Sequence, residues 1–186
     1  ISRLGPWTIS LAIMLFIREQ IRSSNVRRKI YGNQIFSKQI RLPDERQILE
    51  ERGAQTVLFE LQGSLFFGTT DQLYTALEKD LKTCQYMILD MRRVQTFDVS
   101  AAHMLELVKD MLAERGAYLL FSHFPRSVPT GQDLEEYFNE LGLVHPEGQS
   151  QIFAELDGAL EWVENRILAE AQIAPRQEKA LELREI

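Results

Sequence analysis

The chain has 186 residues, of which 45% are apolar and 26% are charged, and its formal net charge is −6. This composition is that of a globular protein, and it excludes a disordered or fibrous chain. The single cysteine, Cys84, excludes an internal disulfide framework and a cysteine-based metal cluster. The three histidines do not follow a zinc-binding spacing. We therefore expect neither a bound metal nor a cofactor.

Charge is divided unevenly along the chain. Residues 1–41 contain eight basic residues and one acidic residue, which gives +7. The other 145 residues contain 13 basic and 26 acidic residues, which gives −13. The two parts differ physically, and they meet near residue 41.

An uncharged run of eleven residues, WTISLAIMLFI, occupies positions 7–17. A bilayer span needs about 20 apolar residues, so this run is too short to cross a membrane alone. Because the chain begins at Ile1 and not at Met, we expect a fragment whose residues 1–17 are the end of a transmembrane helix. A signal peptide fits poorly, since the basic residues follow the run and no small-residue cleavage site is present. A short buried helix of a soluble protein is the alternative.

Basic residues follow this run, which is the pattern of a helix that leaves the membrane on the cytoplasmic side. They could also contact anionic lipid head groups. The cluster consists of Arg18, Arg22, Arg27, Arg28 and Lys29. A nucleic-acid-binding arm is disfavoured, because aromatic residues are not interleaved and the rest of the chain is acidic. We predict that residues 18–41 form a basic cytoplasmic linker with a first short strand.

Short apolar runs predict the strands of a sheet. The runs at residues 56–62, 86–91 and 117–121 are typical of strands, and the latter two are typical of strands buried on both faces. Residues 40–42 and 151–153 are weaker candidates.

Helical spacing occurs between these strands. A capping box at 69–72 predicts the start of the first helix. The second helix is expected to begin near Asp98 and to stop before Gly116. A third is expected before Gly142, and a fourth is expected to be capped by Asp157.

This alternation predicts an α/β domain at residues 42–170, with a mixed, mainly parallel β-sheet backed by helices and preceded by an apolar helix. Residues 171–186 turn polar, which indicates a linker that can lead to a further domain.

The sequence contains none of the common glycine-rich phosphate loops and no G-x-S-x-G motif. Asp98, Ser100 and His103 lie within six positions of one helix start, where they cannot easily act in series as orienter, nucleophile and base. We therefore predict that the protein is not an enzyme. Asp98 and Ser100 have two interpretations: they cap the helix, or the hydroxyl at the helix start is accessible for phosphorylation.

Six segments together resemble a STAS domain over about residues 35–170: VLFELQGSLFFGTTDQL, YMILDMRRVQTFDVSA, ERGAYLLFSHF, YFNELGLV, IF and DGALEWVENRIL. The most specific parts are Asp90, expected at the end of a strand, and the Asp98-Val-Ser-Ala segment, which matches the family's D-x-[ST]-[GA] pattern. The segment at 65–69 is similar to the branch found in SulP anion transporters. Residues 181–186 resemble the lead-in to a cyclic-nucleotide-binding domain.

The resemblance implies a cytoplasmic regulatory and dimerisation domain of a secondary anion transporter for sulfate, bicarbonate or a related anion. Its expected partners are the membrane part of the same transporter and a second copy, at the cell membrane. The alternative is a soluble module like the anti-sigma factor antagonists. In those proteins the phosphorylated residue directly follows the loop Asp, where this chain has Val99, so kinase switching of that kind is not implied. One of Phe66 and Phe67 is expected to face outward as an interaction surface.

Overall fold

The computed structural model describes residues 10–11, 14, 25–124, 138 and 148–182. In chain order the elements are β1 (Val26–Tyr31), α2 (Pro43–Arg52), a 3₁₀ turn (Gly53–Gln55), β2 (Thr56–Leu65), α3 (Phe67–Leu81), β3 (Tyr86–Phe97), α4 (Val99–Ala113), β4 (Tyr118–Ser122), β5 (Ser150–Phe153) and α6 (Leu156–Glu182).

The described strands form one five-stranded sheet in the order β1-β2-β3-β4-β5. The β1 strand runs antiparallel to β2, and the other neighbouring pairs are parallel. This confirms the predicted mixed, mainly parallel α/β fold.

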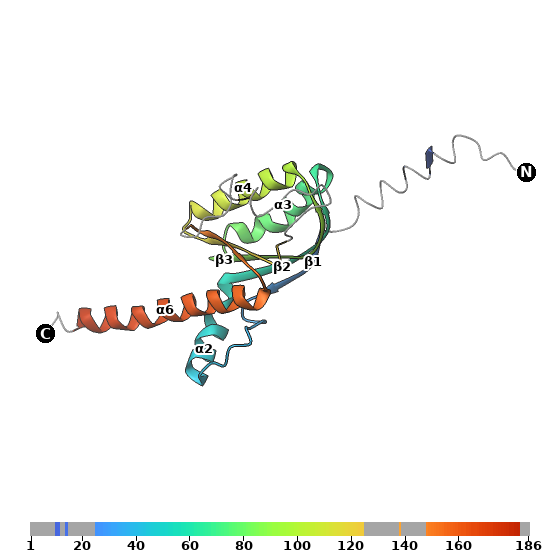
Figure 1. The fold of residues 1–186 in the computed structure, drawn as a ribbon. Coiled ribbons are helices and arrows are strands. Elements are labelled where there is room, and N and C mark those ends of the chain that lie inside the picture. The colour runs from blue at the N-terminus through green and yellow to red at the C-terminus, as the bar shows by residue number, and fades with distance from the viewer. Residues whose placement is uncertain (1–9, 12–13, 15–24, 125–137, 139–147, 183–186) are drawn as a thin grey trace, which may run out of the picture.

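Helices cover both faces of the sheet, with α3 and α4 on one face and α2 and α6 on the other (Figure 1). Successive strand residues point to opposite faces, so each face has its own core. On the α3 and α4 face the core includes Val57, Phe59, Met87, Leu89, Leu119, Phe121, Leu73, Leu77, Leu105 and Val108. On the α6 face it includes Leu58, Tyr86, Ile88, Leu120, Leu49, Leu160, Val163, Ile167 and Leu168. Burial on both faces explains why the central strands read as continuous apolar runs.

The α4 helix begins and ends close to its predicted limits. Asp98 is its N-cap residue, and Gly116, three residues past its last residue, has φ of +70°, a conformation that glycine adopts without strain. The α3 helix begins three residues earlier than expected, since its N-cap is Phe66 and not Thr69. Thr69 lies inside the first turn, where its Oγ1 accepts a hydrogen bond from the Phe66 N–H at 3.1 Å.

The prediction that β3 ends near Asp90 was wrong, because the strand continues to Phe97. Pairing with β4 stops at Asp90 and Ser122, but β2 also continues, and its residues up to Leu65 pair with β3 as far as Phe97. Residues 92–97 are mostly exposed polar positions without a buried apolar run. They therefore resembled a loop in the sequence.

The predicted first strand at residues 40–42 was also wrong. Ile40 and Leu42 are 94% and 68% exposed, and Leu42 directly precedes α2. The first strand is β1, which lies within residues 18–41, where a basic linker with a first short strand was expected. Its sequence, VRRKIY, is rich in basic residues, and among the described strands its only neighbour is β2.

The last helix differs from expectation at both of its ends. The α6 helix begins at Leu156, so Asp157 lies in its first turn and not at its cap, and the helix continues to Glu182 through much of the expected linker. Of the helix predicted before Gly142, only Phe138 is described, and it is buried in the core under α3 and α4.

The predicted helix end at residues 1–17 lies outside the described residues, apart from residues 10, 11 and 14. In the part of the chain that the structure describes, no helix combines the length and the apolar character that a membrane span requires.

Candidate functional site

One carboxylate joins the starts of α3 and α4. Asp98 Oδ1 accepts a hydrogen bond from the Ala101 N–H at 2.9 Å, and Oδ2 accepts one from the Phe67 N–H at 3.2 Å. The Asp98 N–H donates to the Leu65 carbonyl at 3.1 Å. The amino ends of helices carry unpaired N–H groups and positive partial charge. The Asp98 carboxylate satisfies such a group on each helix, which confirms its predicted role as a cap.

The first residue of each of these helices is an exposed apolar side chain. Phe67 begins α3 and is 80% exposed, and Val99 begins α4 and is 57% exposed. Phe66 is half-buried, so the expectation that one of the two phenylalanines faces outward is confirmed. Exposed apolar residues grouped in one place are typical of contact surfaces.

This apolar surface continues along α4. His103 and Leu107 follow Val99 at intervals of four residues, which places all three on one side of the helix. Leu107 is 60% exposed, and the His103 side chain is 62% exposed. We refer to Phe67, Val99 and Leu107 as the apolar surface.

Asp98, Ser100 and His103 do not form a catalytic series. The Asp98 carboxylate is occupied by two backbone amides, and His103 Nδ1 lies 3.4 Å from Glu106 Oε2. The aspartate therefore does not orient the histidine, as a triad requires.

A second polar cluster lies where β4 ends beside the middle of β3. Asp90 is 7% exposed, and its Oδ1 accepts hydrogen bonds from the Arg92 N–H at 3.2 Å and from Ser122 Oγ at 3.3 Å. The same oxygen lies 3.0 Å from His123 Nδ1, and His123 Nε2 lies 2.8 Å from Arg92 Nη2. Because a guanidinium can only donate, we assign the proton of a neutral His123 to Nδ1. Asp90 thus ties the end of β4 to the middle of β3.

The sequence singled out Asp90 but not its partner His123. A signal for the histidine was its position directly after β4, because the pairing of the parallel strands β3 and β4 ends at Asp90 and Ser122. Its φ of +50° is uncommon for a residue other than glycine.

Three members of the predicted basic cluster lie on β1. Arg27 and Arg28 flank Glu60, with shortest ion-pair distances of 3.5 and 2.8 Å. Lys29 Nζ lies 2.7 Å from Asp80 Oδ2, and the Asp80 side chain is only 5% exposed.

Lys29 and its neighbours fasten β1 to α3. The Tyr31 hydroxyl donates to Asp80 Oδ1 at 3.2 Å. Burial by itself would lower the pKa of Lys29, but the contacts with Asp80 and Tyr31 outweigh it, and the pKa is raised. Arg18 and Arg22 lie outside the described residues.

No group of three His, Cys, Asp or Glu side chains in the described ranges is arranged to hold a metal ion.

The sequence model of the STAS domain matches residues 47–156, which contain Asp90, Asp98 and the apolar surface. The chain belongs to the STAS domain family.

Two curated proteins align with most of this STAS chain. It is 26% identical over 171 residues to the vacuolar basic amino acid transporter VSB1 of Saccharomyces cerevisiae, covering 86% of the chain and 16% of that protein. It is 27% identical over 139 residues to Glutaminase 2 of Bradyrhizobium diazoefficiens, covering 75% of the chain and 21% of that protein. The STAS chain thus spans a small part of either relative.

Solved structures with a similar STAS fold include a sulfate transporter family protein from Wolinella succinogenes, at 28% identity and a TM-score of 0.49, covering 62% of this chain and 88% of that one. The anti-sigma factor antagonist SpoIIAA in its unphosphorylated form matches at 16% identity and a TM-score of 0.46, covering 59% of this chain and 89% of that one.

Proposed function

We propose that the chain is the cytoplasmic regulatory and dimerisation STAS domain of a secondary anion transporter of the SulP type, at the cell membrane. The apolar run at 7–17, followed by Arg18 and Arg22, supports the connection to a membrane helix. The yeast relative, which aligns with 86% of the chain, is named a transporter. Its name gives basic amino acids as the solute, so the choice of sulfate, bicarbonate or a related anion rests on the resemblance of residues 65–69 to SulP proteins.

The observation that carries this proposal is the apolar surface, of which Phe67 and Val99 stand at two helix starts that share Asp98. The carboxylate holds both starts through backbone amides, so Phe67 and Val99 are presented on a rigid base. A surface of this kind binds another protein surface and provides no nucleophile. We propose that it contacts the membrane part of the same transporter and that the domain is not catalytic.

The regions around the domain have supporting roles in this proposal. Arg18 and Arg22 lie at the lipid head groups, where cytoplasmic anionic lipid attracts basic residues. Arg27 and Arg28 can contribute, since their side chains are 48% and 59% exposed despite the contact with Glu60. Residues 171–186 lead toward a further domain, and the domain pairs with a second copy.

The proposal is tested by transport in the parent protein, purified and reconstituted in liposomes. Deleting residues 42–170 should impair the uptake of labelled sulfate or bicarbonate and should reduce dimer formation. Unchanged uptake, expression and assembly after the deletion would reject a necessary role for the domain. A soluble antagonist-like module would instead be encoded with an initiating Met close before Ile1 and no further apolar spans upstream.

A further inference from the structure

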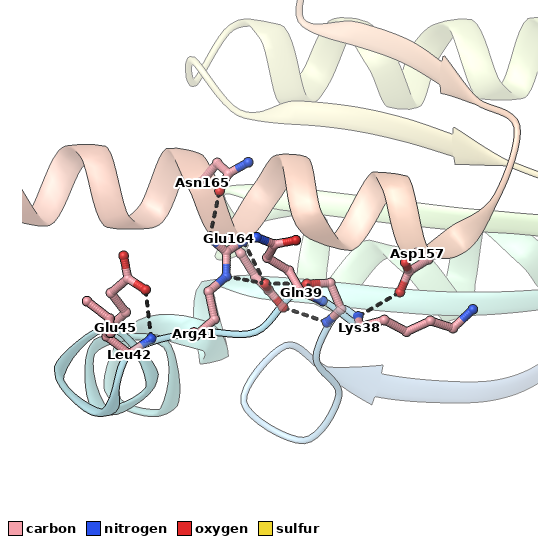
Figure 2. Close-up of polar contacts among 9 residues, drawn as sticks. Lys38, Gln39, Arg41, Leu42, Glu45, Asp157, Glu164 and Asn165 are labelled. Atoms are coloured by element: carbon pink, nitrogen blue, oxygen red, sulfur yellow. Dashed lines mark hydrogen bonds and ion pairs between the residues drawn. The ribbon is translucent and has the colours of Figure 1, made fainter.

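The connector between β1 and α2 lies along α6 and has no regular secondary structure (Figure 2). We refer to residues 33–42 of this connector as the strap. The residue before the strap, Gly32, lies close to Gly53. A Cβ atom on Gly32 would come within 2.7 Å of the Gly53 carbonyl oxygen, so this end of the strap is fixed. At its end, the Leu42 N–H donates to Glu45 Oε2 at 2.9 Å, directly before α2.

A single buried carboxylate of α6 holds the middle of the strap. The Glu164 side chain is 7% exposed. Its Oε1 accepts a hydrogen bond from the Ser37 N–H at 2.7 Å, and its Oε2 accepts one from Ser37 Oγ at 2.6 Å. Arg41 donates to Oε2 through Nε at 3.1 Å and through Nη2 at 2.9 Å. Four hydrogen bonds of the strap therefore end on one side chain.

The Arg41 side chain is nearly as buried as that of Glu164, with 9% of it exposed. Its Nη1 donates to Asn165 Oδ1 at 2.8 Å, so the guanidinium spans two neighbouring residues of α6. Removing one member of a buried ion pair leaves the other charge uncompensated, which is far more costly than losing an exposed pair. Ser37 and Arg41 bind the same carboxylate, so we expect both to lose their contacts with Glu164 together.

The rest of the strap contributes weaker anchors. The Lys38 N–H donates to Asp157 Oδ1 at 2.8 Å. Ile35 and Phe36 are partly buried against the core under α6, whereas Ile40 is 94% exposed. The strap adds no strand to the sheet. Its loss from α6 would therefore leave the ladders of the sheet intact.

We propose that the strap is a latch on α6 that opens as a unit when the contact between Glu164 and Arg41 is lost, while the sheet stays folded. The α6 helix extends beyond the body of the domain toward the carboxyl terminus (Figure 1), whereas the strap directly follows β1. The latch therefore ties the connector after the first strand to the helix by which the chain leaves the domain. This inference depends on the fold and not on the proposed transport function.

Limited digestion of the 186-residue chain with trypsin tests the latch, because Lys38 and Arg41 are cleavage sites inside the strap. Lys82, directly after α3, reports unfolding of the domain in the same digest. In Glu164→Gln, cleavage after Lys38 and Arg41 should be at least about tenfold faster, because local opening exposes the strap, and cleavage after Lys82 should stay at the wild-type rate.

The matched control is Glu78→Gln, which removes a glutamate from an exposed pair with Lys82 and should leave strap cleavage unchanged. Arg41→Gln, read at Lys38, should repeat the effect of Glu164→Gln, and Ser37→Ala should give a smaller increase. Strap cleavage that stays at the wild-type rate in Glu164→Gln would overturn the proposal. So would equal acceleration after Lys38 and Lys82, since the strap would then open only when the whole domain unfolds.

Discussion

Asp98 satisfies backbone amides of two helices with one carboxylate, and it thereby determines how the apolar surface is presented. The two oxygens have different tasks, since Oδ1 caps α4 and Oδ2 holds the first amide of α3. An arrangement of this kind needs both oxygens, and it needs the side chain to be short.

Replacing Asp98 with Ala should destabilise the domain by about 1–2 kcal/mol, because the α4 cap is lost and the Phe67 amide loses its acceptor. Asp98→Asn keeps one acceptor oxygen and should cost less. The free energy of unfolding in urea measures both effects. Ser100→Ala is the neighbouring control, and a loss in Asp98→Ala no larger than in this control would contradict the capping role.

Tyr86 makes stability sensitive to alkaline pH. Burial, together with its hydrogen bond to Glu170, raises the pKa of Tyr86 from 10.0 to about 12. Burial also raises the pKa of the Cys84 thiol, from 9.0 to about 11. The folded state holds these protons more tightly than the unfolded state, so stability is fully present below the unfolded pKa values and falls as pH rises through the folded ones.

The free energy of unfolding should therefore decline from about pH 9 to pH 12. In Tyr86→Phe, which cannot ionise, the decline between pH 10 and 12 should be shallower. Urea unfolding followed by circular dichroism at a series of pH values measures this slope. Equal slopes in wild type and Tyr86→Phe would show that Tyr86 does not carry the effect.

At the scale of elements, the strands buried on both faces were predictable and the edge strand was not. The central runs of β2, β3 and β4 are apolar because helices cover both faces, and their sequence shows it directly. The β1 strand is an edge strand whose basic residues pair with Glu60 and Asp80, acids far away in the sequence. No local pattern indicates such pairing.

The same reasoning applies to the candidate site. Asp98 was predictable as a cap because its local pattern defines a helix start. Its second contact, with Phe67, depends on how two helices meet, and so does the pairing of Arg41 with Glu164 across 123 residues. The polar extension of β3 was missed because its only described strand partner there is β2.

A chain that comprises residues 25–171 should therefore fold, whereas one limited to 42–170 should be markedly less stable. The shorter chain lacks β1, so Asp80 loses its partners Lys29 and Tyr31. The Asp80 carboxylate, which is only 5% exposed in the full chain, is then left without them. It also lacks Arg41, the buried partner of Glu164. Thermal unfolding of the two chains makes the comparison, and equal midpoints would contradict the assignment of β1 to the folded domain.

In the whole molecule, the two faces of the sheet carry different features. One face carries α3 and α4, whose amino ends present the apolar surface. The other carries α6 and the strap, which join the beginning of the domain to its end (Figures 1 and 2). The overall charge of −6 combines a basic stretch at residues 1–41 with an acidic remainder. Part of the basic stretch belongs to the folded domain, since Arg27, Arg28 and Lys29 lie on β1 and Arg41 lies in the strap.

The most direct test of the proposed function is uptake of labelled anion by the reconstituted parent protein when the apolar surface is changed. A Phe67→Ser and Val99→Ser double variant removes two exposed side chains and should leave the fold intact. The matched control is Ile40→Ser, which removes a still more exposed apolar side chain from the strap on the other face. Labelled sulfate, bicarbonate and lysine are supplied in parallel, since the yeast relative is named for basic amino acids. We expect anion uptake to fall several-fold in the double variant and to be unchanged in the control. Anion uptake unaffected by the double variant, or uptake of lysine alone, would contradict the proposed function.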